Sequence, residues 1–465
     1  MSKFKAYRKE QEMLFPSNLM DYVPASHLAR VVDQVVEQLD TRNIEDKYSD
    51  RGQHTYHPKI MTKLLFYGYA VGERSGRVIS RKTETDTAYM YLSQMYKPNF
   101  RTINDFRKNH LKELSEYFVA IVKYCAELNM VNIGQIHIDG TKMKANASSR
   151  RTKDQDGYAQ WIKRIEEKIQ KLLNEAQVVD EEEDKLYGDK RGDELPEEIN
   201  TQEKLKAKLQ EIAKRFKEPE QKINATDPDA PGMPKINIGY NCQAAVTNEQ
   251  IIVAAEVITD TNDKQALIPV LKAVETTVDQ TVTEVSADAG YASFHNYEYL
   301  SKNGMTGYIP DQDLANLKRN QLPLYHTERF AYDAGQNVYR CPQGQILSKD
   351  RRWRKDNNQY TIYKAKDCTG CHDKSLCTQQ NQRTVAREDR RPLLEQMRER
   401  LNSILGQEKY QKRMFTIEPV FGHLKHNLGY RYFLLRTLEK VQGEFKIMCT
   451  AYNIKKIFQF GLLTG

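Results

Sequence analysis

Hydrophobic residues recur at helical spacing through the first part of the chain. One stripe runs from Leu28 to Leu39, and a second runs from Ile60 to Leu65. Residues three and four apart lie on one face of an α-helix, so both stripes predict amphipathic helices that bury one side. The pattern predicts a helical N-terminal domain over residues 1–130.

A further helix in this domain is expected to carry basic side chains opposite its apolar face. Thr102 precedes an apolar set that begins at Phe106, which favours a capped helix. Short helices with basic faces are typical of DNA-contacting domains, and a charged face turned to solvent is an equal alternative. The basic residues concerned are Arg101, Arg107, Lys108 and Lys112.

The pattern changes after residue 130. Alternating apolar residues lead into Asp139-Gly140, which predicts a strand that delivers a carboxylate at its end. Two apolar strands over 240–246 and 251–258 predict a hairpin, residues 263–279 predict an amphipathic helix, and the next strand ends at Asp288. Because strands and helices alternate, residues 131–465 are predicted to form an α/β domain.

Two segments interrupt this domain. Residues 150–223 carry two apolar stripes on helices rich in Lys and Glu, which predict a helical hairpin with a structural or oligomerising role. Residues 312–400 contain few apolar residues and a dense basic stretch near their end, which either contacts phosphate or faces solvent. The arginines of that stretch include Arg387, Arg390, Arg391 and Arg398.

Four of the seven cysteines fall inside the second insertion. A Cys-x-x-Cys pair with two further cysteines fits a tetrahedral four-thiolate zinc site, which would be structural because no ligand position stays open. Reduced thiols without metal are the alternative, and His372 is a substitute ligand. The predicted zinc ligands are Cys341, Cys368, Cys371 and Cys377, whereas Cys125, Cys242 and Cys449 are expected in the core.

Composition narrows the classes of protein. Charged residues make up 29% and hydrophobic residues 39%, which is typical of a folded, soluble chain, and the formal net charge is +8. This excess suits a polyanion such as DNA if the charges cluster. The sequence contains no apolar run of the kind that secretory signals or membrane spans have. We therefore expect a cytoplasmic protein without a membrane partner. The sequence contains no Walker-type Gly-rich loop, so we expect no nucleotide cofactor.

Three acidic residues are candidates for metal chemistry. Asp139 and Asp288 follow predicted strands, and Glu418 stands before Pro419 at a helix start or bend. Alone, each has a simpler interpretation as a turn residue or as part of an ion-paired helix face. Phosphodiester cleavage, however, requires charge stabilisation on the attacking and leaving oxygens, which two ions about 3.5–4 Å apart supply through carboxylate ligands.

Several short motifs, taken in order, resemble the DDE transposases of bacterial insertion sequences. They are Thr102-Ile-Asn-Asp-Phe-Arg107, His137-Ile-Asp139-Gly-Thr-Lys142, Ala145-Asn146, Thr226-Asp-Pro-Asp229, Gly239-Tyr-Asn-Cys-Gln243, Ala287-Asp288-Ala-Gly-Tyr291 and Ile417-Glu418-Pro-Val-Phe-Gly422. Together they span nearly the whole chain. The resemblance implies a helical N-terminal DNA-binding domain followed by an RNase H-like catalytic domain over residues 131–465.

The same resemblance implies the site residues. It assigns Asp139, Asp288 and Glu418 to a triad that binds Mg²⁺ or Mn²⁺. A Tyr, Arg, Glu and Lys signature surrounds the glutamate in that family, and here the gap between the arginine and the glutamate is one residue longer than in the commonest form. The residues that we expect to contact DNA are Lys142, Tyr410, Arg413 and Lys425.

The leading hypothesis is therefore a transposase that cuts the ends of its element and joins them to target DNA, as a homo-oligomer on double-stranded DNA. An RNase H-like nuclease without strand transfer and a non-catalytic, zinc-stabilised DNA-binding protein are the alternatives. Three other acids near the predicted strands, Asp260, Asp263 and Glu284, are interpreted as supporting or surface residues.

Overall fold

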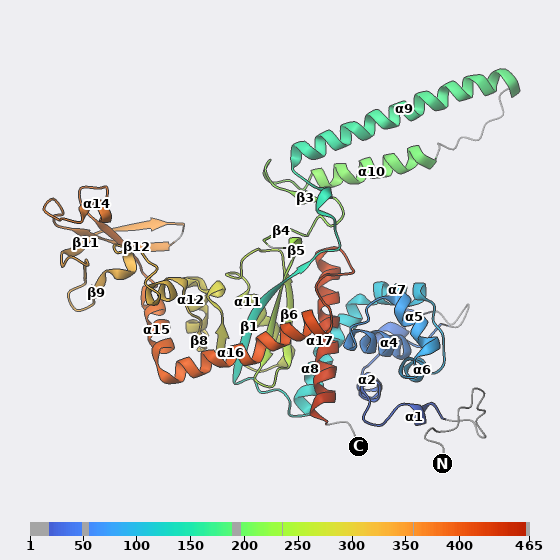
Figure 1. Cartoon of the computed structure of the whole chain (residues 1–465), viewed down its shortest axis with the longest axis horizontal. Helices are drawn as coiled ribbons and strands as arrows, with labels where there is room; N and C mark the ends of the chain where they lie inside the picture. Colours follow the sequence, from blue (N-terminus) through green and yellow to red (C-terminus); the bar gives the residue numbers. More distant parts are fainter. Residues whose placement is uncertain (1–17, 49–54, 188–196, 235, 357, 462–465) are drawn as a thin grey trace, which may run out of the picture.

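The computed structural model describes residues 18–48, 55–187, 197–234, 236–356 and 358–461, with the backbone alone over 173–187 and 197–200. The basic residues near the start of the chain, within 1–16, lie outside the described residues. A central sheet stands between a group of N-terminal helices and the insertion over 312–400, and the insertion over 150–223 projects from one end of the sheet (Figure 1). The mixed α/β architecture expected from the sequence is confirmed. In the described ranges, no helix combines the length and the apolar character that crossing a membrane requires.

The N-terminal helices bury the two predicted stripes. Helix α4 is buried along almost its whole length, and α2 packs against it. The elements are α1 (Leu19–Tyr22), α2 (Leu28–Glu37), α3 (Arg42–Glu45), α4 (Pro58–Ala70), α5 (Gly76–Thr85), α6 (Thr87–Leu92), α7 (Phe100–Asn109) and α8 (Leu111–Glu127).

Three residues of the basic face predicted around α7, Arg101, Lys108 and Lys112, are exposed, whereas the fourth, Arg107, is buried. The N-terminal cap of α7 is Asn99, whose side chain accepts a hydrogen bond from the Thr102 amide at 3.0 Å. Arg107 is buried and donates to the Tyr69 hydroxyl at 3.2 Å and to the Arg74 carbonyl at 3.0 Å. A buried guanidinium is tolerated only where its N–H groups find acceptors, so Arg107 serves packing and contributes nothing to a DNA-facing surface.

Strand β1 lies at the centre of the main sheet. It pairs antiparallel with β5 on one side and parallel with β7 on the other, so the sheet is mixed. The strand order is β4-β5-β1-β7-β8, with β6 also paired to β5. The strands are β1 (Gln135–Lys144), β4 (Gly232–Met233), β5 (Asn237–Thr247), β6 (Ile252–Ile258), β7 (Glu284–Ala287) and β8 (Thr306–Tyr308).

Helix α17 (Leu438–Phe460) joins the N-terminal helices to this sheet. It packs against α8, α4 and α2 on one side and against β6 on the other. Its Glu444 is fully buried and accepts hydrogen bonds from the Leu434 and Leu435 amides, with Arg74 at 3.4 Å. One hydrophobic core therefore runs continuously from the N-terminal helices into the sheet across residue 130.

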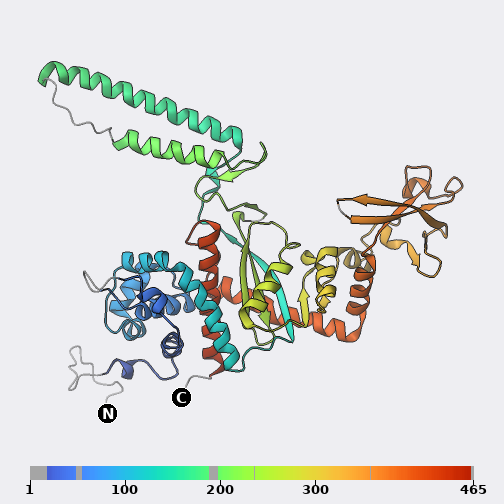
Figure 2. The same cartoon turned by 180° about the vertical axis from the view of Figure 1, so that it is seen from behind.

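The helical hairpin predicted within residues 150–223 is present. Helices α9 (Gln155–Tyr187) and α10 (Glu197–Ala213) run side by side away from the sheet (Figures 1 and 2). A separate core at the base, which includes Tyr158, Ile165 and Leu209, holds them together. The short 3-10 turn Ser149–Arg151 and the paired strands β2 (Thr152–Lys153) and β3 (Ile223–Asn224) close that base.

The second insertion has a sheet and a core of its own. Its five strands pair in the order β13-β12-β11-β10-β9, and Tyr339, Leu347 and Tyr363 lie in its core. The strands are β9 (Ala331–Asp333), β10 (Val338–Arg340), β11 (Ile346–Lys355), β12 (Asn358–Ala365) and β13 (Thr384–Glu388). The helices around and after it are α11 (Leu267–Val278), α12 (Phe294–Lys302), α13 (Gln312–Lys318), the 3-10 turn Thr327–Arg329, α14 (Lys374–Cys377), α15 (Arg391–Asn402) and α16 (Ile404–Gly422).

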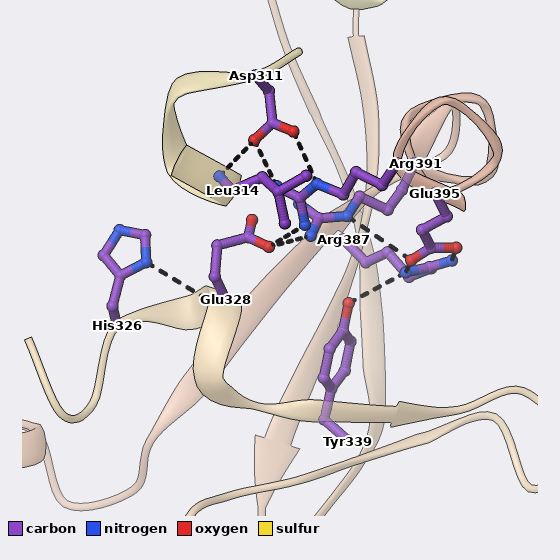
Figure 3. A network of polar contacts seen from close by, with 9 residues as sticks. Asp311, Leu314, His326, Glu328, Tyr339, Arg387, Arg391 and Glu395 are labelled. Carbon is purple, nitrogen blue, oxygen red and sulfur yellow. Dashed lines mark hydrogen bonds and ion pairs between the residues drawn. The ribbon is translucent and has the colours of Figure 1, made fainter. Parts of the chain in front are cut away.

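The arginines near the end of this insertion are engaged in ion pairs (Figure 3). Arg398 contacts Asp311 at 2.5 Å and Glu328 at 2.6 Å, and Arg391 contacts Glu328 at 2.5 Å. Arg387 pairs with the half-exposed Glu395 at 2.6 Å, and Arg390 pairs with Glu388 and Glu298. Of the two interpretations of this stretch, the free solvated face is wrong, because these guanidinium groups are paired and fix the insertion on α15. The pairing also leaves little of their charge for contact with a phosphate.

Glu328 is the acid on which this network converges. Burial raises the pKa of Glu328, but the hydrogen bonds from Arg391 and Arg398 outweigh burial and hold the pKa at about 2, against an ordinary value of 4.5. Because the folded-state pKa is depressed, the stabilisation is fully present above pH 4.5 and is lost as the pH falls toward 2.

We predict that Glu328→Gln lowers the free energy of unfolding of the insertion by about 3 kcal/mol at pH 7, because two buried guanidinium groups lose their shared partner. Urea unfolding followed by tryptophan fluorescence measures the change. Glu395→Gln is the matched control, since the Glu395 side chain is 42% exposed and its loss should cost less than about 1 kcal/mol. Equal effects of the two substitutions would contradict the assignment.

Candidate active site

The parallel register of β1 and β7 brings two of the predicted acids together. Ile138 is paired with Ala287, so the next positions along the two strands are Asp139 and Asp288. Adjacent strands lie about 4.8 Å apart, which makes these two carboxylates neighbours. Asp288 follows the last residue of β7, as predicted. Asp139, which was expected at a strand end, lies inside β1, because antiparallel pairing with β5 continues to Lys144.

Backbone amides hold both carboxylates in place. The Asp139 Oδ1 atom accepts a hydrogen bond from the Gly140 amide at 2.8 Å. Asp288 caps the 3-10 turn Ala289–Tyr291, and its Oδ1 atom accepts from the Gly290 amide at 2.8 Å. Each carboxylate therefore keeps one oxygen for another partner.

Glu418 comes from α16, which crosses the sheet beside β1 and β7. The sequence predicted a helix start or bend at Glu418, but Glu418 and Pro419 both lie inside the helix. Pro419 has no N–H to bond the carbonyl four residues earlier. That carbonyl, on Phe415, instead accepts a hydrogen bond from the Gln250 side chain at 3.1 Å, so the helix continues through the proline.

A second contact anchors α16 on the sheet. Lys409 forms an ion pair with Glu284 at 2.6 Å, and its carbonyl accepts from the Gln135 side chain at 2.9 Å. Glu284 is thus a supporting residue that helps to place the helix carrying Glu418.

Arg413 lies between two of the acids. Its Nη1 atom is 3.0 Å from Asp139 Oδ2, and its Nη2 atom is 3.4 Å from Glu418 Oε1. The guanidinium is 5.9 Å from the ring centre of Tyr410, and the side chain is only 11% exposed. Acids from β1 and from α16 therefore meet at one guanidinium, with Asp288 beside Asp139.

The electrostatics of Asp139 reflect this crowding. Burial is the main factor that raises the pKa of Asp139, to about 6, and the negative charge of Asp288 adds to it. Arg413 and the Gly140 amide act in the opposite direction. Ordinary aspartate pKa values lie near 4, so the site still lacks positive charge for its carboxylates.

The chemistry of the donors fits a hard divalent cation, because carboxylate oxygens are the ligands that Mg²⁺ prefers. Yet in the part of the chain that the structure describes, no group of three or more His, Cys, Asp or Glu side chains is arranged to hold a metal ion. At the acids, Arg413 stands between Asp139 and Glu418 and supplies the positive charge there.

A fourth acid borders the site. Asp263 Oδ1 accepts hydrogen bonds from the side-chain amides of Asn241 and Gln243, both at 2.7 Å. A Cβ atom added to Gly290 would lie 2.9 Å from Asp288 Oδ1 and 3.2 Å from Asp263 Oδ2, so the absence of a side chain lets the two carboxylates approach. The sequence analysis ranked Asp263 only as a supporting or surface residue. The signal in the sequence that could have identified Asp263 is the pair of amide residues, Asn241 and Gln243, at alternating positions of β5.

The basic residues predicted to contact DNA occupy different places. Lys425 lies in the π-helical segment His423–Asn427 and donates to the Lys142 carbonyl at 3.1 Å. Burial lowers the pKa of Lys425. Lys142 lies on β1, three positions after Asp139, and is paired with Asn241 of β5. Because side chains alternate along a strand, the Lys142 side chain is on the face of the sheet opposite to that of Asp139.

The four cysteines of the second insertion line one small cavity of about 20 Å³. No metal-holding group is found among them or elsewhere in the described ranges, so the zinc prediction is not supported. Cys341 accepts a hydrogen bond from the Gln345 amide at 3.2 Å, and Cys368 is buried in the core of the insertion. His372 is fully exposed and pairs with Asp373. Cys125, Cys242 and Cys449 are buried, as expected.

Comparison with known proteins identifies two regions. Residues 340–458 match the family described as Transposase DDE domain, and residues 17–109 match the one described as Transposase domain (DUF772). No curated protein and no solved structure matches the chain.

The DDE match contains Glu418, Arg413 and most of α17, and it begins after Asp139 and Asp288 in the sequence. The second match covers the helices from α1 to α7. A DDE domain implies an RNase H-like fold and a metal-dependent DNA-cutting enzyme that uses Mg²⁺ or Mn²⁺, and the mixed sheet is consistent with that fold. The chain belongs to the DDE transposases of insertion sequences.

Proposed function

We propose that this transposase cleaves DNA at the ends of its element and joins the freed ends to target DNA, with Asp139, Asp288 and Glu418 as the metal-binding acids. The observation that carries the proposal is the convergence of carboxylates from β1 and α16 on Arg413, with Asp288 beside them through the strand register. Residues almost 280 positions apart meet there, and a merely structural ion pair would need only one of these acids.

Bound divalent ions would stabilise the charge that develops on the attacking and leaving oxygens of the phosphodiester. The protein contributes rigidity. Asp139 and Asp288 are fixed by backbone amides, whereas Glu418 is placed by a helix that Lys409 and Gln250 hold on the sheet. Rigid carboxylates reduce the reorganisation that binding a cation requires.

Arg413 has two roles in the proposal. Without metal it neutralises Asp139 and Glu418, and when cations take over that charge its fork of N–H donors becomes free to meet a DNA phosphate. Tyr410 and Lys425 are proposed as further DNA contacts near it, whereas Lys142, on the other face of the sheet, would contact DNA away from Arg413.

The remaining parts of the proposal concern partners. The N-terminal helices would recognise the terminal repeats, and a homo-oligomer in the cytoplasm would hold two element ends and the target duplex. A nuclease without strand transfer would share the acids and is separated by supplying pre-cut ends and measuring joining. A non-catalytic role does not account for the assembled acids. Zinc is not part of the proposed function, because no ligand group among the described residues supports a zinc site.

We predict that Asp139→Asn, Asp288→Asn and Glu418→Gln each lower Mg²⁺-dependent cleavage of terminal-repeat DNA by at least about 100-fold, since each removes a carboxylate that would hold the cation. Gel-shift affinity should change less than about threefold. Glu256→Gln, an acid of β6 that pairs with Lys446, is the control and should cut normally. Cleavage retained by Asp288→Asn would remove that residue from the triad.

We predict that Arg413→Ala destabilises the metal-free chain by about 3 kcal/mol, because Asp139 loses its buried partner. Thermal unfolding in chelator measures this loss. Added Mg²⁺ should raise the Tm of the variant more than that of the unsubstituted chain, because the ion replaces the missing charge without displacing a guanidinium. Identical Mg²⁺ shifts would show that Arg413 does not occupy the cation position.

Asp263 is predicted to act as a positioning residue. Asp263→Asn keeps an oxygen that can accept from both amides and should retain cleavage within about threefold. Asp263→Ala frees the amides of Asn241 and Gln243 and should lower kcat by about tenfold, the rate equivalent of one or two lost hydrogen bonds. A loss with Asp263→Asn as large as with Asp288→Asn would instead identify Asp263 as a metal ligand.

A further inference from the structure

The strand β11 of the second insertion carries an exposed row of cations. Nine of its ten residues are exposed. From Lys349 to Lys355 the sequence is Lys-Asp-Arg-Arg-Trp-Arg-Lys, with five cations and one acid, which gives a net charge of +4 in seven residues. Such density on one strand is costly through self-repulsion and requires a physical explanation.

The strand register distributes these cations over both faces of the β11–β12 hairpin. The pairing shifts between Lys349 and Arg351, so Asp350 is the extra residue of a bulge. Beyond the bulge, Arg351, Trp353 and Lys355 share one face, while Arg352 and Arg354 share the other.

An aromatic pair lies among the cations. Trp353 is opposite Tyr360, with ring centres 5.5 Å apart, and Trp353 is 45% exposed. The core of the insertion lies toward the other end of the hairpin, around Leu347 and Tyr363. Packing within the chain therefore does not account for a large aromatic side chain at this position.

Internal ion pairing does not account for Lys349, Arg352 or Lys355 either. Arg351 pairs with the adjacent Asp350 at 3.0 Å, but its side chain is 68% exposed and such a pair is worth less than about 1 kcal/mol. In the described part of the chain, no carboxylate pairs with Lys349, Arg352 or Lys355. The contrast is with Arg391 and Arg398 of the same insertion, which are half-buried and paired.

We propose that the β11–β12 hairpin is a DNA-binding arm that holds duplex DNA by its phosphates. Strands of a sheet can lie in the major groove, which is about 12 Å wide, and cations on both faces of β11 can then reach the phosphates of both groove walls. Trp353 and Tyr360 offer apolar contact with the sugars or base edges. This inference rests on the proposed function, because it names a surface for the same DNA partner.

The position of the arm ties it to the acids. The insertion is locked to α15 through Arg398, Asp311 and Glu328, and α15 leads directly into α16, which carries Glu418. The arm and the N-terminal helices lie on opposite sides of the central sheet (Figures 1 and 2). DNA held by the arm would thus be fixed relative to the site from the side that the N-terminal helices do not cover.

The test uses the full chain with Arg351→Gln, Arg352→Gln and Arg354→Gln combined. Exposed positions should tolerate these changes without loss of fold. The affinity for a terminal-repeat duplex should fall at least about tenfold at physiological salt, and the slope of log K against log salt should fall by about 2 to 3, since each lost phosphate contact contributes about 0.9. The matched control, with the same change of charge on the helical hairpin, combines Lys163→Gln, Arg164→Gln and Lys214→Gln.

Equal loss in the two triple variants would overturn the proposal, because affinity would then follow net charge alone, and an unchanged slope in the arm variant would overturn it as well. Trp353 provides a direct readout in a Trp161→Phe chain: its fluorescence should shift on titration with duplex DNA. A shift with anionic phospholipid vesicles but not with DNA would also overturn the proposal. Failure of the unsubstituted chain to bind DNA at all would instead contradict the proposed function.

Discussion

Arg413 is the group around which the site is organised. Its guanidinium contacts Asp139 from the sheet and Glu418 from its own helix, and Asp288 lies beside the first of these. Three carboxylates brought this close without a cation would repel one another. Burial is the main factor that raises the pKa of Asp139, and the charge of Asp288 adds to it. The internal guanidinium allows the acids to be preassembled in the folded chain. It also means that a metal ion must compete with an ion pair rather than enter an empty site.

The rest of the architecture keeps this arrangement in register. A slip of one residue between β1 and β7 would separate Asp139 from Asp288 and turn one of them to the other face of the sheet. Pro419 leaves the Phe415 carbonyl of α16 without its helical N–H partner, and the Gln250 side chain donates to that carbonyl beside Glu418. The continuous core through α17 then fixes the N-terminal helices relative to these elements, so a DNA end bound by those helices would be held at a defined distance from the acids.

The sequence was informative where chemistry depends on local pattern. Periodicity predicted α2, α4 and the paired helices of the first insertion. The motifs assigned Asp139, Asp288 and Glu418 to one site, which stays a prediction, and the fold places them near Arg413. It failed where the outcome depends on partners distant in the chain. The continuation of β1 past Asp139 is decided by β5, a hundred residues later, and the role of Asp263 is decided by two amides on that same strand. The cysteine spacing suggested zinc, but spacing alone does not fix where thiols point.

Basic residues illustrate the same limit. In the sequence, the arginines around Arg391 and those of β11 are equally dense, and either group could be assigned to DNA. The structure separates them through their partners. Arg391 and Arg398 have given up hydration for Glu328, so moving them to a phosphate would leave a buried carboxylate unpaired at a cost of several kcal/mol. Arg352 on β11 remains hydrated and exposed, so its transfer to a phosphate releases counterions at little internal cost. Availability of charge, rather than its amount, decides which surface of this transposase can hold DNA.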